Sequence, residues 1–215
     1  MIDRIDFIRA NTRLLAPPLV PEIRLHLAEE SLPIWRKTEE ELGEMGLPPP
    51  YWAFAWAGGQ ALARYILDHA KDIADKRILD IGAGSGLAAI AAAKAGARYV
   101  MADDIDPLAL TAMALNAEAN GTAITVTADD WLSGPSPPGD IVLVGDLFYE
   151  RPLAERVMAF VRQKAAEGSL VLVGDPRRSY FPADAFIAVA HYEVPVTREL
   201  EDAEIKRAAV WQLRK

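Results

Sequence analysis

The sequence predicts an α/β protein with a mostly parallel β-sheet, and three observations carry that prediction. Short apolar runs alternate with longer segments of helical character between residues 77 and 175, as expected of parallel strands joined by helices. The apolar runs end close to acidic residues. The chain has 215 residues and is 51% hydrophobic, so it is long enough for one domain with a substantial core.

The predicted elements follow from periodicity and residue type. Continuous apolar runs, such as residues 140–145 and 169–173, are typical of strands buried on both faces. Predicted strands cover residues 77–80, 98–102, 124–127, 140–145, 169–173, 186–194 and 208–213, with a polar loop over 197–207. Predicted helices cover residues 61–69, 87–95, 108–120 and 152–166.

Residues 1–50 are proline-rich and irregular, and we interpret them as a small N-terminal cap on a domain formed by residues 51–215. Alternation of polar and apolar residues predicts a strand over 22–27. The other predicted elements of the cap are helices over 2–9 and 35–42 and a loop over 11–21.

Composition excludes several classes of site. The chain has no cysteine, and its three histidines are far apart, so neither a disulfide nor a metal-ligand motif is predicted. No apolar run approaches the ~20 residues of a membrane span, and the N-terminus does not resemble a targeting peptide. The net charge of −8 does not suit a nucleic-acid binder. We therefore expect a cytoplasmic protein without nucleic-acid or membrane partners.

Three glycines at alternate positions, Gly82, Gly84 and Gly86, follow the first strand of the predicted sheet and precede an alanine-rich helix. Glycine permits positive φ angles and lets a ligand approach the main chain. The spacing departs from the dinucleotide motif G-x-G-x-x-G, because Leu87 stands where the third glycine belongs. Asp80 at the strand end opposes a pyrophosphate but suits the cationic S-adenosylmethionine (SAM). The loop therefore predicts a SAM site.

Further acids extend this site. Asp104 follows the second strand, where a carboxylate can accept hydrogen bonds from both ribose hydroxyls; the alternative is a tight turn with two solvated acids. Asp130 and Trp131 can bind the adenine amino group and cover its ring, although a capped loop explains them equally well. Ile105 and Gly145 complete the predicted cofactor-binding residues. One edge of the sheet is expected to carry five acids, namely Asp80, Asp104, Asp130, Asp146 and Asp175.

Residues 51–56 contain four aromatic residues and lead into a glycine pair. Aromatic faces attract cations such as a sulfonium, whereas the simpler explanation is core packing. We expect a mixture, with Phe54 in the core, Trp56 facing the cofactor and Trp52 near the substrate entrance.

Residues 146–149 supply the predicted catalytic residues. A lysine that accepts a methyl group must be neutral, although its ordinary pKa is about 10.4, and an aromatic pocket lowers that pKa. Asp146 and the Tyr149 hydroxyl are expected to orient the amine, with Phe148 as a pocket wall. The alternative is a helix cap with core aromatics. Arg177 either meets a substrate protein or neutralises Asp175, and the sequence leaves both open.

Two segments carry a specific resemblance: Trp-x-x-x-Trp-x-Gly-Gly-Gln at 52–60 and Gly-Asp-x-Phe-Tyr at 145–149. With Asp104 and the glycine loop, they resemble the electron transfer flavoprotein β-subunit lysine methyltransferases, within the class I SAM-dependent methyltransferases. The resemblance implies a Rossmann-like sheet of seven strands with helices on both faces, SAM as cofactor, the flavoprotein β subunit as protein partner, and a monomer. The chain looks bacterial, and Ala57 replaces a proline that is frequent in the family.

Other functions remain as alternatives. A lysine methyltransferase for a ribosomal protein shares the same motifs. Leu87 and Asp80 argue against a nicotinamide-dependent oxidoreductase, and Asp146 and Tyr149 argue against a SAM-binding module without catalysis.

Overall fold

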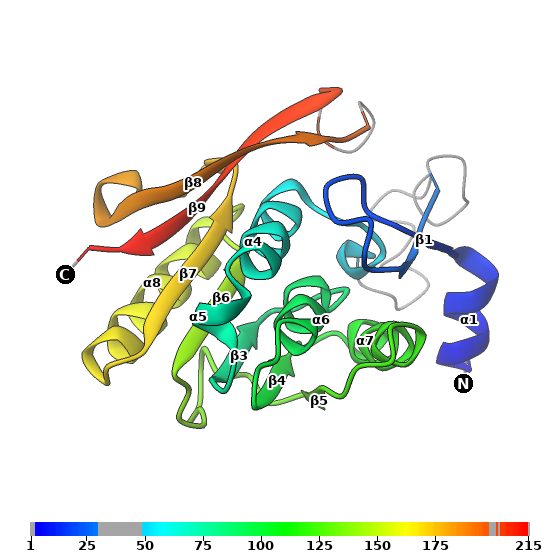
Figure 1. Ribbon diagram of the computed structural model, residues 1–215, viewed down its shortest axis with the longest axis horizontal. Coiled ribbons are helices and arrows are strands. Elements are labelled where there is room, and N and C mark those ends of the chain that lie inside the picture. Colours follow the sequence, from blue (N-terminus) through cyan, green and yellow to red (C-terminus); the bar gives the residue numbers. More distant parts are fainter. Residues whose placement is uncertain (1–2, 30–48, 198–200, 202, 215) are drawn as a thin grey trace.

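A computed structural model describes residues 3–29, 49–197, 201 and 203–214 and contains a central seven-stranded sheet (Figure 1). The strand order is β5-β4-β3-β6-β7-β9-β8. The first five strands in this order are parallel, and β9 is antiparallel to both of its neighbours. The strands are β3 (Arg77–Ile81), β4 (Tyr99–Asp103), β5 (Thr125–Thr127), β6 (Ile141–Gly145), β7 (Leu170–Asp175), β8 (Phe186–Pro195) and β9 (Ile205–Leu213). The predicted mostly parallel α/β sheet is confirmed.

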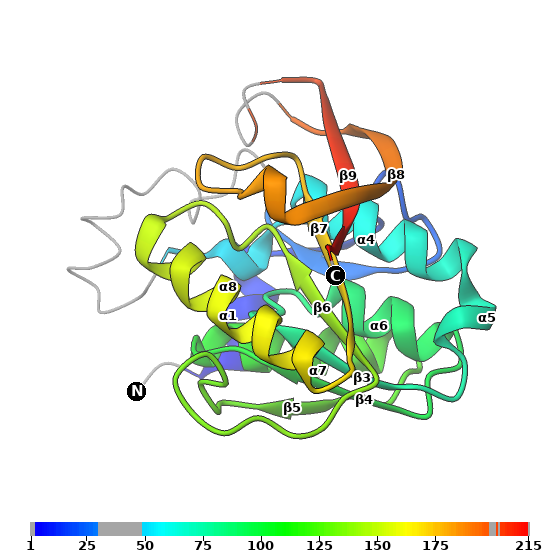
Figure 2. The ribbon, with the colours of Figure 1, turned by 90° about the vertical axis from the view of Figure 1, so that its left-hand side faces the viewer.

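Helices cover both faces of the sheet (Figures 1 and 2). Helix α8 packs on one face, and α4 and α6 pack on the other. The helices are α4 (Ala57–Asp68), α5 (Ala70–Ile73), α6 (Leu87–Lys94), α7 (Pro107–Ala119) and α8 (Arg151–Ala166), with short 3₁₀ turns η1 (Tyr51–Ala53) and η2 (Ala183–Ala185).

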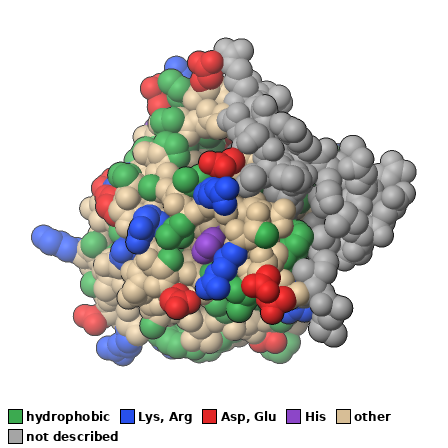
Figure 3. Space-filling model, turned by 90° about the vertical axis from the view of Figure 1, so that its right-hand side faces the viewer, with side chains coloured by type: hydrophobic (Ala, Val, Ile, Leu, Met, Phe, Trp, Pro, Cys, Tyr) green, Lys and Arg blue, Asp and Glu red, His purple; other side chains and the backbone are tan. Residues whose placement is uncertain are grey.

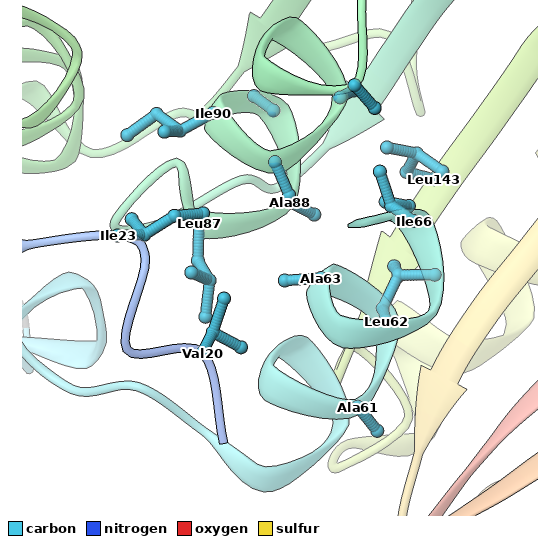
Figure 4. Close-up of a cluster of buried hydrophobic side chains, with 14 of the residues drawn as sticks. Val20, Ile23, Ala61, Leu62, Ala63, Ile66, Leu87, Ala88, Ile90 and Leu143 are labelled. Carbon is cyan, nitrogen blue, oxygen red and sulfur yellow. The ribbon is translucent and has the colours of Figure 1, made fainter. Parts of the chain in front are cut away.

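Alternating side chains of the central strands divide the core into two layers. Ile141 and Leu143 of β6 belong to the cluster with α4 and α6 (Figure 4), and Val142 and Val144 belong to the cluster with α8. Successive side chains of a strand point to opposite faces, so continuous apolar strands fit a sheet that is buried on both sides.

The N-terminal residues pack against this core. Helix α1 (Arg4–Asn11) is capped by Asp3, and strands β1 (Arg13–Leu15) and β2 (Leu25–Leu27) form a separate two-stranded sheet. The segment between them places Val20 and Ile23 against α4 and α6 (Figure 4). The N-terminal helix was predicted close to its observed position. The prediction of a loop over 11–21 was wrong at Arg13–Leu15, because this segment pairs with β2 and forms β1. The helix predicted over 35–42 lies outside the described residues.

Two further predictions were wrong at element boundaries. The helix predicted to begin at Ala61 begins at Ala57, so that a glycine pair lies in its first turn. The loop predicted over 197–207 ends earlier, because β9 begins at Ile205 and pairs there with Pro195 of β8. In both cases a tertiary contact outweighs local composition.

The contact that accounts for the start of α4 at Ala57 joins this helix to β7 through two glycines. A Cβ atom on Gly58 would overlap with the carbonyl oxygen of Gly174, and a Cβ atom on Gly174 would overlap with that of Gly58. The backbones therefore touch directly, and only glycine fits at either position.

We expect Gly174→Ala to lower the free energy of unfolding by about 1–3 kcal/mol, the usual cost of an overpacked core. The added methyl group meets backbone, which cannot rotate away as a side chain does. Chemical denaturation measures the change. Gly134→Ala is the control, because its Cβ would make only an ordinary contact of 3.5 Å with Asp130. Equal stability of the two variants would contradict the close backbone contact.

Candidate active site

A pocket of about 540 Å³ lies at the carboxyl ends of β3, β4 and β6. Open parallel sheets bind ligands at this edge, and the volume is in the range of small-molecule sites. The predicted site residues that line it are Trp56, Asp80, Gly82, Gly84, Asp104, Ile105, Asp130, Gly145, Asp146 and Tyr149. The structure thus brings together residues from five separate parts of the chain.

The glycine loop forms one wall of the pocket. Gly82 and Gly84 have positive φ angles, and their N–H groups donate to Asp103 (3.1 Å) and Asp104 (2.9 Å) at the end of β4. Gly86 was predicted to bind the cofactor, but it is not among the lining residues. It precedes α6 with φ 77°, and a Cβ atom there would lie 3.0 Å from Met113. Its role is to turn the chain into the helix.

Asp80 lies at the back of the pocket and is almost completely buried. One of its oxygens accepts a 2.9 Å hydrogen bond from the N–H of Ala89 in the first turn of α6. Burial raises the pKa of Asp80 to about 8. Without a cation beside it, this carboxyl keeps its proton at neutral pH, which differs from the fixed negative charge that the sequence predicted.

Two neighbouring acids follow β4. The carboxylate of Asp104 accepts from the N–H groups of Gly84 and Asp106, both at 2.9 Å, and burial raises its pKa. Burial also raises the pKa of Asp103 to about 7. Sequence reasoning missed Asp103, although the adjacent acid pair at a strand end was a signal for it.

The segment after β5 differs from its prediction. Asp130 lines the pocket but forms an ion pair with Arg156 of α8, with an N–O distance of 2.6 Å. Trp131 is 2% exposed within the α8 cluster and is not a lining residue, so the prediction that it covers an adenine ring is wrong. A large indole contributes more to stability when it is fully buried in the core than when it lies at the rim of a pocket. Leu132 lines the pocket instead.

Asp146 follows β6 with a φ angle of 57°, a conformation that Asp tolerates better than most residues. Its Oδ2 accepts from the N–H of Gly59 at 2.7 Å, and its Oδ1 accepts from Arg178 at 2.8 and 3.0 Å. Arg178 also forms an ion pair with the buried Glu201 at 2.7 Å. Burial raises the pKa of Asp146, while the charge of Arg178 opposes that shift.

Sequence reasoning missed Arg178 and Glu201 and considered Arg177 in their place. The exposed guanidinium of Arg177 lies over the ring of Trp211, 5.2 Å from its centre, and Arg177 does not line the pocket. Asp175, at the end of β7, is buried, accepts from the N–H of Arg178, and has a pKa raised by burial to about 7. The adjacent arginine pair was the only sequence signal, and nothing in the polar segment around Glu201 distinguished that residue.

Aromatic side chains form the mouth and walls of the pocket. Tyr149 lies 5.5 Å from Tyr51 between ring centres, and burial raises its pKa to about 12, so its hydroxyl remains a donor. Phe148 was expected to be a wall but is fully buried against Phe181, because the side chains alternate around the turn after β6. Trp52 lines the pocket yet is 1% exposed, so it is not at an entrance.

Among the described residues, no group of three or more His, Asp or Glu side chains is placed to hold a metal ion, and no helix there is long and apolar enough to cross a membrane.

Comparisons with known proteins place the chain in a family. The model of the ribosomal protein L11 methyltransferase (PrmA) family matches residues 60–165. The electron transfer flavoprotein beta subunit lysine methyltransferase of Xenopus laevis is 36% identical over 212 residues, covering 96% of this chain and 85% of the relative. The protein of that name from Homo sapiens is 32% identical and covers 95% of this chain and 80% of its own length.

The chain belongs to the electron transfer flavoprotein beta subunit lysine methyltransferase family. Family membership makes it a methyltransferase, and the oxidoreductase alternative is not favoured. A SAM-bound magnesium protoporphyrin IX methyltransferase from Synechocystis has the same fold, with a TM-score of 0.53 at 18% identity over 73% of this chain and 80% of that one.

We expect Asp80→Asn to reduce the pH dependence of stability in this family member between about pH 4 and 8. The folded chain keeps the Asp80 proton up to about pH 8, whereas an unfolded chain releases it near the ordinary value of 3.8. Folding therefore takes up a proton in this window, and the free energy of unfolding falls as the pH rises through it.

Chemical denaturation of the ligand-free protein at several pH values measures this slope. Asp129→Asn, which changes an exposed carboxylate, is the matched control. If Asp80→Asn keeps the slope of the wild-type protein, Asp80 is ionised throughout the window and the prediction is wrong.

Proposed function

We propose that this chain binds SAM in the pocket and transfers its methyl group to lysine side chains of an electron transfer flavoprotein beta subunit. The observation that carries the proposal is that Asp146 and Tyr149 line the same pocket as the glycine loop. The match to the flavoprotein methyltransferases, over 95–96% of this chain and 80–85% of the relatives, supports the choice of substrate.

The residues present fit SAM in three respects. The main chain of Gly82 and Gly84 is open to the pocket, and a side chain on Gly82 would press on Leu147 at 3.0 Å. Acidic groups at Asp80 and Asp104 suit a cationic ligand that also carries a ribose. The ring of Trp56 already faces a cation, because the guanidinium of Arg178 lies 5.2 Å from its centre.

A buried donor adds to this fit. The Nε1–H group of Trp52 has no hydrogen-bond partner among the described residues, and Trp52 is one of the lining residues of the pocket. An unpaired buried donor costs about 1–3 kcal/mol, and a ligand that carries acceptors can recover part of that cost after a small movement of the wall.

When bound, SAM supplies an electrophilic methyl group, and the residues of this chain bind the reactants, orient them and exclude water. Asp104 holds the nucleoside, while Trp56 and Tyr51 reduce the access of water to the reacting atoms. Asp146 and Tyr149 orient the lysine amine from the side of β6. Positioning of this kind can supply a large part of the barrier reduction in a displacement reaction.

A protein partner is consistent with the surface near the pocket. Three lining residues of the pocket are large and exposed: Ile105 is 72% exposed, and Tyr51 and Tyr149 are 41% and 36% exposed. On the face in Figure 3, acidic and basic side chains are interspersed among the described residues. We propose a monomeric enzyme that receives a folded protein at this opening and does not bind nucleic acid.

A ribosomal protein is the second candidate substrate. The ribosomal protein L11 methyltransferase of Pasteurella multocida is 40% identical to this chain, but over only 42% of it. That match leaves out a large part of the chain, which the flavoprotein methyltransferases cover. We therefore favour the flavoprotein.

Incubation with labelled SAM and purified flavoprotein beta subunit tests the proposal, with ribosomal protein L11 in a parallel reaction. Label on lysines of the flavoprotein is the expected result, located by mass spectrometry. Label on L11 alone would favour the second candidate. Calorimetric binding of SAM with no label on either protein would contradict lysine methylation of these substrates.

We expect Asp146→Asn to lower kcat at least about 100-fold, in the range of a lost catalytic acceptor, while the Kd for SAM stays within a few-fold of the wild-type value. The amide keeps the shape and tolerates the positive φ angle, but it lacks the charge that holds Arg178 and orients the amine. Steady-state kinetics and calorimetry measure the two effects. Asp129→Asn is the control, and unchanged turnover of Asp146→Asn would remove Asp146 from the site.

A further inference from the structure

Arg178 is the most highly connected cation in the described part of the pocket. Its guanidinium donates to Asp146 at 2.8 and 3.0 Å and to Glu201 at 2.7 and 3.1 Å. It also lies over the face of Trp56. The side chain is 18% exposed, against 9% for Asp146 and 1% for Glu201. Arg178 therefore presents a fixed positive charge to the pocket from between two buried carboxylates.

The two carboxylates are fixed from their other side by the start of α4. The N–H of Gly59 donates to Asp146 at 2.7 Å, and the N–H of Ala57 approaches Glu201 at 3.4 Å. Buried carboxylates that are bonded in this way cannot follow Arg178 if it moves. The arginine is therefore held in one orientation by a rigid set of acceptors.

Other charged groups surround this arginine. Asp175 of β7 accepts from its backbone N–H, and Lys206 of β9 lies 3.5 Å from Glu201. Asp104 and Tyr149 line the pocket with it, and α4 contributes no charged side chain at this end, only its N-terminal N–H groups. The carboxylates of Asp146 and Glu201 are thus balanced by two cations before any substrate arrives.

We propose that Arg178 is a positioning residue for methyl transfer, which aims Asp146 at the substrate lysine and disfavours the protonated form of that lysine through its fixed positive charge. The inference rests on the proposed function. A protonated lysine beside Asp146 would lie close to the fixed positive charge of Arg178, which disfavours the charged form, whereas a neutral amine meets no such repulsion and can donate a hydrogen bond to Asp146.

Methyl transfer requires this discrimination between the protonated and the neutral lysine. The lysine ammonium must first release one proton to solvent, which frees the lone pair on nitrogen. That lone pair forms the new nitrogen–carbon bond as the methyl–sulfur bond breaks, and the electron pair of the broken bond stays on sulfur. The positive charge passes from sulfur to the methylated nitrogen, so charge and atoms balance.

The pH dependence of kcat tests the inference with two opposite substitutions. Arg178→Gln removes a positive charge, so the protonated lysine is favoured and the midpoint of the rising limb should move up by about 1 pH unit. Glu201→Gln removes a negative charge, and the midpoint should move down. Arg178→Lys keeps the charge but loses the two-point contact with Asp146, so its midpoint should stay near that of the wild type while kcat falls.

Arg177→Gln is the matched control, because this neighbouring arginine lies over Trp211 outside the pocket. Its profile should equal that of the wild type, and SAM affinity measured by calorimetry should be retained in all variants. A lower kcat with an unmoved midpoint in both Arg178→Gln and Glu201→Gln would show a merely structural role and overturn the inference. Shifts in the same direction would also overturn it. A wild-type protein that binds SAM but methylates neither candidate substrate would overturn the proposed function, and this inference with it.

Discussion

The direct contact between Gly58 and Gly174 is the constraint on which the rest of the site depends. It brings the start of α4 against the end of β7, with no side chain between the two backbones. Helix α4 has no side-chain cap of its own, since its N-cap residue is Trp56. Two of its free N–H groups meet carboxylates from distant parts of the chain: that of Gly59 donates to Asp146, and that of Ala57 lies 3.4 Å from Glu201. One backbone contact thus orders Asp146 of the predicted amine site and Glu201, which pairs with Arg178.

The same arrangement explains why the site is acidic without being fully charged. Burial raises the pKa of Asp80 to about 8, and those of Asp103 and Asp175 to about 7. Asp146 and Glu201 differ from these acids, because Arg178 forms ion pairs with both of them. The pocket therefore contains two kinds of carboxyl group: Asp80 and Asp103 hold protons until a cation is near, whereas Asp146 is already paired with an arginine. Carboxyls of these two kinds can serve different ligands within one pocket.

Much of the fold and of the cofactor side could be predicted from the sequence because their signals are local. Strand β3, which carries Asp80, and the glycines after it lie within ten residues, and parallel strands bring Asp104 and Asp146 to the same edge. Phe148 and Trp131 were misplaced because composition does not show on which side of a turn an aromatic ring lies. Arg178 and Glu201 were missed because their meaning depends on pairing across the fold.

The balance of charge at Arg178 also bears on ligand choice. A pyrophosphate at the glycine loop would lie near Asp80, Asp103 and Asp104, and the described residues offer no lysine or arginine beside that loop. The arginines of the pocket, Arg156 and Arg178, are already paired with carboxylates. An anionic ligand would therefore have to compete with Asp130 for Arg156 or break the largely buried pair between Arg178 and Asp146, and either costs binding free energy. A ligand with a positive centre meets neither cost, because it can pair with acids that still hold their protons and displace those protons to solvent.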